Sequence, residues 1–398
     1  MVAKISSGSF SPGDHVFLQG EVIPAFFKVN EGKFAKVFSK KSVMDLGIKH
    51  MLNEADLVGI VSHQELFGEI EALTGKPQEF SVFALEESSV TAVPADDREG
   101  LKTCLSTEPK IGVKACVSFA RYMRQFFAHF GSVAREEVEL EAFIRGVARD
   151  YMAGVNELAN AVCPAVNDPD YVAARSHKAL ELSRHLLRAS EAHPFGGSSV
   201  PCCVLSDFGK ENAFEFKADT FLCREGEVGD TLFILVEGSA EVVTEGNGPN
   251  IVIDNPGSII GEIAVFLNLE LPRPDMRRTA AVVCKTDVKA VVLQLDQVEE
   301  FFVAHPEILH KMLQAMINRS DNTQKLCEKS ESRLKSMLYD TLGVLLEGMN
   351  DMALRLSRRN DNQALARPAA LFTQCARTVY NRFRESLGLI AARDKIKT

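Results

Sequence analysis

A turn in the second half of the chain carries residue types that bind a phosphate. Gly261 has no Cβ, so it lets the backbone approach a ligand and open a short helical turn. The first N–H groups of that turn, near Ile263 and Ala264, would point at an anion. Arg278 follows with a guanidinium that pairs with phosphate through charge-assisted, bidentate hydrogen bonds. This spacing predicts an anion receptor made of backbone donors and one cation.

Two side chains beside these residues suit a hydroxyl group. Glu262 directly follows the glycine, and its carboxylate would accept a hydrogen bond from a ribose hydroxyl. Thr279 directly follows the arginine and would offer its own hydroxyl to a phosphate or a base. The set is therefore consistent with a ligand that carries a hydroxyl group as well as a phosphate.

An internal repeat contains this turn. Residues 10–32 recur 206 positions later as residues 216–238 without a gap, and both segments end in Glu-Gly. A second match pairs residues 67–70 with residues 260–263, which include Gly261. We therefore expect two copies of one domain, each with its own version of the turn.

Short runs of β-branched and aromatic residues predict strands in both copies. In the second copy these runs cover residues 232–236, 240–244, 251–253, 279–283 and 288–295. Many short strands separated by glycine turns indicate a small barrel or a jelly roll.

Helical patterning covers the region between the copies and the end of the chain. Apolar residues at helical spacing predict one helix over residues 114–161 and another over residues 172–192. From Pro306 onward an apolar stripe predicts a long helix that ends near Gly343 and Gly348. The stripe consists of Ile308, Leu309, Met312, Leu313, Met316 and Ile317.

Four features together resemble the cyclic nucleotide-binding domain family, which includes kinase regulatory subunits, gated channels and the catabolite activator protein. They are Gly226, the turn at Gly238, Gly261–Ala264 and Arg278–Ala280. The resemblance covers residues 214–313 closely and residues 10–97 less closely. It implies a receptor that takes cyclic AMP or cyclic GMP as its ligand and needs no other cofactor. Thr279 leaves the choice between the two nucleotides open.

The resemblance implies an α+β fold with two cyclic nucleotide-binding-type β-barrels, or jelly rolls, joined by a helical linker and followed by a long helix and a helical C-terminal segment. The expected domains are a degenerate barrel over 1–110, the helical linker over 111–200, the nucleotide-binding barrel over 201–305 and the C-terminal helices over 306–398. The implied ligand-binding residues are Gly261, Glu262, Ile263, Ala264, Arg278, Thr279 and Ala280.

The first copy retains the turn but lacks the cation. Gly68 and Glu69 match the start of the turn, and the family spacing places Gln78 where the arginine belongs. A neutral amide does not offset a phosphate charge, and Glu79 adds repulsion. Lys76 is the one nearby cation that would rescue binding. We expect a degenerate site that serves assembly or another ligand.

Bulk properties favour a cytoplasmic binding protein over an enzyme. No apolar run is long enough for a membrane span, and the first residues lack the apolar core of a signal peptide. Nine scattered cysteines without a C-x-x-C spacing indicate free thiols and no zinc site. Nucleophile-elbow, zinc-protease and Walker A motifs are absent. His177, His185 and His193 fit capping or solvated roles better than a metal site.

Charge is distributed unevenly along the chain, and the sequence leaves three functions open. The net charge of the chain is −9, but ten basic and three acidic residues follow Met352. The favoured function is a cyclic nucleotide receptor, plausible as a homodimer, whose C-terminal helices shift to signal to a protein partner. Alternatives are a nucleotide-responsive transcription factor with this basic tail on DNA, and an assembly protein that binds no ligand. For the tail we favour a basic helical cap over DNA contact.

Overall fold

A computed structural model of the protein describes residues 8–40, 55–95, 98–162, 168–188, 213–243, 251–359 and 363–396. The chain forms two compact units. Unit 1 comprises Met1–His129 and Phe195–Gln324, and unit 2 comprises Phe130–Pro194 and Lys325–Thr398. Among the described residues, no helix is long and apolar enough to cross a membrane.

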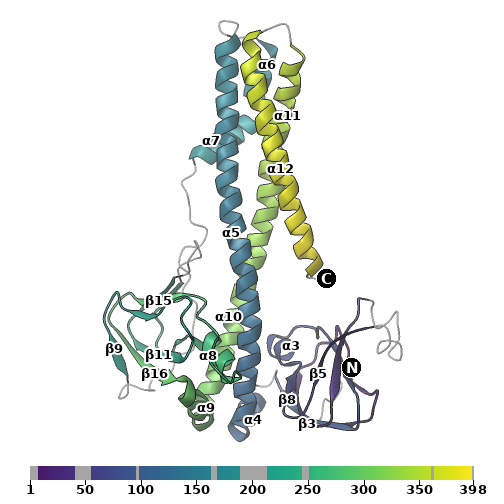
Figure 1. Ribbon diagram of the computed structural model, residues 1–398, viewed down its shortest axis with the longest axis vertical. Coiled ribbons are helices and arrows are strands. Elements are labelled where there is room, and N and C mark those ends of the chain that lie inside the picture. Colours follow the sequence, from purple (N-terminus) through teal and green to yellow (C-terminus); the bar gives the residue numbers. More distant parts are fainter. Residues whose placement is uncertain are drawn as a thin grey trace. The chain divides into compact units, whose positions relative to one another are not determined.

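The first barrel consists of two four-stranded antiparallel sheets (Figure 1). Their strand orders are β1-β8-β3-β6 and β2-β7-β4-β5. The strands are β1 (Gly8–Phe10), β2 (His15–Phe17), β3 (Ala25–Glu31), β4 (Phe34–Phe38), β5 (Asp56–Val61), β6 (Leu66–Phe67), β7 (Ser81–Ala84) and β8 (Ser88–Pro94). The short helix α3 (Glu69–Thr74) follows β6, and α4 (Arg98–Thr107) follows β8.

The second barrel repeats this plan, with strand orders β9-β16-β11-β14 and β10-β15-β12-β13. Its strands are β9 (Phe214–Phe216), β10 (Phe221–Cys223), β11 (Thr231–Glu237), β12 (Ala240–Val243), β13 (Ile251–Ile253), β14 (Ile259–Ile260), β15 (Ala281–Cys284) and β16 (Val288–Gln294). Helix α8 (Glu262–Leu269) follows β14, and α9 (Leu295–Ala304) follows β16. The two jelly-roll domains confirm the predicted α+β fold.

Irregularities in the sheets recur at matching positions of the two barrels. The β3–β8 pairing shifts register between Val29 and Glu31, and the β11–β16 pairing shifts between Leu235 and Glu237. The glycine after each strand, Gly238 in the second barrel, has a positive φ, and a Cβ there would lie 2.2 Å from the carbonyl oxygen of Asp287. The repeat therefore extends from the sequence to the bulges and turns of the backbone.

A helix that begins with a proline follows each barrel. Helix α5 (Pro109–Val162) follows α4, and α10 (Pro306–Ser336) follows α9. Proline suits the first turn of a helix because the N–H that it lacks would have no partner there. The two helices touch within unit 1, since a Cβ on Gly112 would lie 2.6 Å from the Leu309 side chain.

Unit 1 has an apolar core to which both barrels and these helices contribute. Its fully buried members include Phe26 of the first barrel, Leu232 of the second, Phe119 of α5 and Leu309 of α10. The stripe predicted on the long helix is confirmed, because all its members except the partly buried Ile317 are buried in this core. The same helices therefore support both barrels.

Unit 2 is helical. Besides parts of α5 and α10 it contains α6 (Pro169–Ser176), α7 (Lys178–Arg188), a π-helical stretch (Met337–Leu342), α11 (Gly343–Ser357) and α12 (Ala366–Ile396). The single helix predicted over 172–192 is wrong, because extended backbone at His177 separates α6 from α7.

The two glycines expected to end the long helix lie instead at the start and inside α11. A Cβ on Gly348 would lie 2.6 Å from the Cβ of Ala179, and one on Gly154 would lie 2.6 Å from the ring of Phe372. Tyr151 packs edge-on against Phe372, with ring centroids 5.7 Å apart. These glycines allow the helices of unit 2 to approach closely, so their role is packing.

Candidate functional site

The turn at Gly261 begins helix α8. Gly261 is the residue before the helix and has a φ of 88°, a left-handed conformation that suits glycine. No side chain caps this end of the helix. The first N–H groups of a helix have no acceptor within it, so those of Ile263 and Ala264 are placed to bind an anion. Ala264 itself is buried and Ile263 is half-buried.

Arg278 reaches back to this turn from the loop before β15. Its Nη1 donates to the carbonyl oxygen of Gly261 at 3.0 Å, and its Nη2 donates to the carbonyl oxygen of Thr231. The side chain is 6% exposed, and its Nε has no partner among the described residues. Among the described residues the hydrogen-bond partners of this buried guanidinium are carbonyl oxygens, so its positive charge is available to an anion.

Glu262 lies beside this arginine and already has a cationic partner. It is 4% exposed, and its Oε1 is paired with Nη1 of Arg319 on α10. The structure therefore brings together the turn, the arginine and the carboxylate that the sequence predicted. It also adds a second arginine, which the sequence pattern did not identify.

Thr279 and Ala280 lie at the edge of this cluster. Thr279 is exposed, while Ala280 is half-buried and directly precedes β15. The thiol of Cys223, on the neighbouring strand β10, lies 4.0 Å from the carbonyl oxygen of Ala280. Burial raises the pKa of this thiol, so Cys223 is a neutral neighbour of the site.

Asn268 is a structural residue of the site that the sequence analysis missed. Its side-chain amide donates to the carbonyl oxygens of Gly229 and Met276 at 2.9 and 3.0 Å. Its Oδ1 accepts from the N–H groups of Asp275 and Met276 at 2.9 and 2.8 Å. Three of these bonds fasten the segment that carries Arg278 onto helix α8, and the fourth joins the helix to Gly229. An asparagine on an apolar helix is the one sequence signal that could have identified it.

The first barrel builds the same turn with different side chains. Gly68 has a φ of 74° and precedes α3. The N–H of Gln78 donates to the carbonyl of Glu21 at 2.8 Å, and its carbonyl accepts from the N–H of Gly20 at 2.8 Å. Arg278 makes the matching pair of bonds to Glu227 and Gly226, at 2.8 and 3.0 Å. The backbone therefore places Gln78 in the position of Arg278.

The first barrel lacks a cation at Gln78 and has three carboxylates near this turn, those of Glu69, Glu71 and Glu79. Gln78 is buried and its Nε2 has no partner among the described residues. Glu71, in the position of Ala264, has a pKa raised by burial and by repulsion from Glu69 and Glu79. Such an environment disfavours an anionic ligand.

Lys76, the cation that would rescue this site, points elsewhere. Its Nζ donates to the hydroxyl of Tyr122 on α5 at 3.1 Å and to Oε1 of Gln324 on α10 at 2.5 Å. Lys76 therefore connects the first barrel to the helices of unit 1.

Aromatic rings fill the interior of the first barrel. Phe67 stacks on Phe27 at 5.3 Å between ring centroids, and it contacts Phe17 at 5.8 Å and Phe34 at 5.5 Å. A Cβ on Gly68 would lie 3.2 Å from the Phe17 ring, which therefore lies against the start of the turn. In the second barrel the sheet registers put Cys223, Ala240 and Ile260 in the positions of Phe17, Phe34 and Phe67. The sequence analysis missed this difference in volume.

Other residues that the sequence singled out lie in unit 2. The Nδ1 of His177 accepts from the N–H of Ala179 at 3.1 Å, which is a capping role at the start of α7. His185 lies within α7, and His193 lies outside the described residues.

Acidic residues of unit 2 pair with part of the basic tail. Arg359 binds Asp168 at 2.6 Å, Arg367 lies 3.3 Å from Glu157, and Arg382 lies 3.9 Å from Glu139. The tail from Ala366 to Ile396 is a single helix. These pairs fit the helical cap better than a DNA-reading motif.

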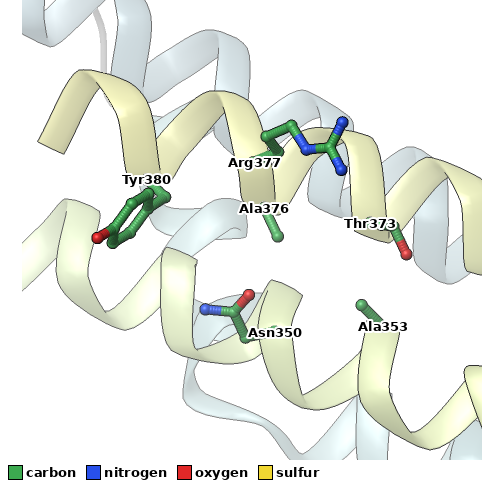
Figure 2. Close-up of a pocket in the computed structure, with 6 residues that line it drawn as sticks. All are labelled: Asn350, Ala353, Thr373, Ala376, Arg377 and Tyr380. Carbon is green, nitrogen blue, oxygen red and sulfur yellow. The ribbon is translucent and has the colours of Figure 1, made fainter. Parts of the chain in front are cut away.

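A shallow groove of about 250 Å³ lies between α11 and α12. Figure 2 shows its lining, which consists of Asn350, Ala353, Thr373, Ala376, Arg377 and Tyr380. All four polar side chains in this lining are exposed. The groove shares no residue with the turn at Gly261.

Comparison with known proteins identifies the two barrels. The family model described as "Cyclic nucleotide-binding domain" matches residues 8–102 and 213–305. A "CRP-like cAMP-activated global transcriptional regulator" of Mycobacterium tuberculosis is 28% identical over 102 residues, which are 25% of this chain and 42% of the regulator. "Cyclic nucleotide-gated channel alpha-4" of Mus musculus is 26% identical over 156 residues, covering 35% of this chain and 27% of the channel. The chain thus spans less than half the length of either relative.

Two solved structures of regulatory proteins align with most of the chain. The regulatory domain of Toxoplasma gondii PKA with cAMP is 14% identical, with 78% of this chain and 85% of that one covered at a TM-score of 0.21. The regulatory subunit of a cAMP-independent protein kinase A from Trypanosoma brucei is 15% identical, with 80% and 82% covered at a TM-score of 0.24.

Proposed function

Because residues 8–102 and 213–305 are tandem domains of the cyclic nucleotide-binding family, we propose that the protein is a receptor for cyclic AMP or cyclic GMP whose second domain holds the ligand. One observation carries the proposal. Arg278 is buried next to the N-terminus of α8, and its hydrogen-bond partners among the described residues are the carbonyl oxygens of Gly261 and Thr231. The carboxylate of Glu262 belongs to the first residue of the same helix. A cyclic nucleotide presents a phosphate and a ribose hydroxyl, which need these two groups.

Each predicted residue has a role in this proposal. Arg278 and the N–H groups of Ile263 and Ala264 would bind the phosphate, because Arg278 is hydrogen-bonded to Gly261, the residue that precedes helix α8. Glu262 would accept the ribose hydroxyl. Thr279, exposed next to Arg278, would contact the phosphate or the base, and Ala280 would continue into β15. These groups do not choose between the two nucleotides.

Ligand binding would be transmitted through helices that follow the barrel. Phe266 of α8 stacks on Phe302 of α9, with ring centroids 5.8 Å apart, and both rings are fully buried. Movement of α8 onto the phosphate would therefore displace α9 and α10, which follow one another along the chain. We propose that this displacement signals to a protein partner and that the receptor is a homodimer. The described cysteines form no disulfide with one another, which supports a cytoplasmic location.

Titration calorimetry with cyclic AMP and cyclic GMP tests the proposal. The wild-type protein should bind one of them, and Arg278→Ala should weaken binding at least about thirtyfold, since removing one member of a buried charged pair costs about 2–5 kcal/mol. Arg277→Ala is the matched control, because Arg277 is exposed and donates to the carbonyl of Gly226. Absence of heat with either nucleotide, or equal losses in both variants, would contradict the receptor assignment.

A further inference from the structure

The carboxylate proposed for the ribose is engaged by the chain itself. Oε1 of Glu262 is paired with Nη1 of Arg319, and Nη2 of Arg319 donates to the carbonyl of Ile259 at 3.4 Å. Glu262 is 4% exposed, whereas the Arg319 side chain is 21% exposed. A carboxylate this deeply buried requires a donor, and Arg319 supplies it.

Arg319 belongs to a stretch of α10 that contacts both turns. Five residues further along the helix, Gln324 accepts a hydrogen bond from Lys76, which follows α3 of the first barrel. Lys76 is also bonded to Tyr122 of α5. Two polar contacts on one helix therefore connect α10 to the turn of each barrel.

We propose that Arg319 is an internal competitor for the ribose site, which keeps α10 docked on the second barrel until a nucleotide replaces it. The inference rests on the proposed function. The hydroxyl of a ribose and the guanidinium of Arg319 are both donors, and both require the same carboxylate. Since Arg319 is partly exposed, it can leave for water when the ligand arrives. Docking of α10 and nucleotide binding then oppose one another, and the opposition is reciprocal.

Calorimetry on Arg319 variants tests this competition. Arg319→Ala and Arg319→Gln should both bind the nucleotide more tightly than the wild type, by about tenfold, which lies in the usual range of coupling between sites. Lys325→Ala removes a positive charge from an exposed position of the same helix and should leave the affinity unchanged. Weaker or unchanged binding in both Arg319 variants would overturn the inference.

A double variant separates competition from a general effect of the charge. In a Glu262→Gln background, Arg319→Ala should no longer tighten binding, because the shared carboxylate is gone. An undiminished gain in that background would overturn the inference. If the wild type and every variant fail to bind, the receptor assignment fails as well. If the wild type binds and the Arg319 variants bind no more tightly, the receptor assignment stands and the competition fails.

Hydrogen exchange supplies a readout that does not depend on affinity. Nucleotide should increase exchange in residues 306–324 of the wild type, because α10 leaves its docked position. Arg319→Gln should show the increase without nucleotide, and thermal unfolding would establish that this variant is folded. Unchanged exchange in this segment on binding would count against the inference.

Discussion

The two barrels share a backbone and differ in chemistry. Gly68 and Gly261 both turn with positive φ, and Gln78 and Arg278 make the same pair of backbone hydrogen bonds. Only the second barrel has a buried cation at this position. Turn glycines, bulges and sheet registers therefore maintain this fold, whereas a few side chains around the turn determine the charge of the site.

The interiors of the two barrels differ in the size of the side chains that fill them. The first barrel closes its interior with stacked phenylalanines, including Phe67, where the second has the smaller Ile260. Large rings bury more apolar surface and stabilise a core. The first barrel has therefore gained packing where it lost the cation.

The largest effect on stability is expected when a side chain is placed between Gly261 and Arg278. Gly261→Ala should destabilise the protein by roughly 3–5 kcal/mol, because left-handed backbone is strained for alanine and the guanidinium loses its bonds. A Cβ there would lie 2.2 Å from Nη1 of Arg278. Gly226→Ala is the control, because Gly226 also has a positive φ, of 80°, but no atom lies within 4 Å of the place where a Cβ would be. This substitution should lower the free energy of unfolding by only about 1–2 kcal/mol. Urea unfolding measures both, and equal losses would show that Arg278 is not held at the turn.

A smaller, pH-dependent effect is expected at Glu71 in the first barrel. Burial first, and then repulsion from Glu69 and Glu79, raise the pKa of Glu71 above 4.5. A raised pKa in the folded state adds stability below the unfolded pKa, and this contribution is lost as pH rises through the folded pKa. Glu71→Gln should therefore raise the melting temperature at about pH 7.5 and not at about pH 4. Glu87→Gln, at an exposed position of the same barrel, is the control, and a gain independent of pH would contradict this account.

The smallest effect on nucleotide binding is expected from restoring the cation in the first barrel. In Gln78→Arg the new guanidinium would pair with the surrounding glutamates, and the Phe17 ring would still lie against the turn. Calorimetry should therefore show the same number of binding events as in the wild type. A second binding event in this variant would show that charge alone separates the two barrels.

The sequence contained enough information for the fold and the main residues of the site, because turns depend on local rules. Glycines at fixed offsets and alternating apolar residues predict the jelly rolls, and Gly261 with Arg278 predicts the anion site. The role of Arg319 was not predictable in this way, because it contacts Glu262 only once α10 packs on the barrel. The aromatic filling was also missed, since it depends on which strands face one another.

Helix boundaries in unit 2 were also hard to predict from the sequence alone. Gly348 and Gly343 suggested a helix end, but close packing against α7 explains a glycine inside α11 equally well. Local sequence does not reveal which neighbour a glycine will have. His177, by contrast, divides a predicted helix through its own extended backbone and its bond to the N–H of Ala179.

The hydrogen bonds of Asn268 have a mechanical consequence. Three of them join α8 to Asp275 and Met276, and they hold Met276 by both its N–H and its carbonyl, so helix α8 is fastened to the segment that carries Arg278. A ligand cannot draw in the helix and leave Arg278 behind. The turn should then behave as a two-state element, open or closed. Under the proposed function, each chain would therefore respond to its nucleotide in an all-or-none manner.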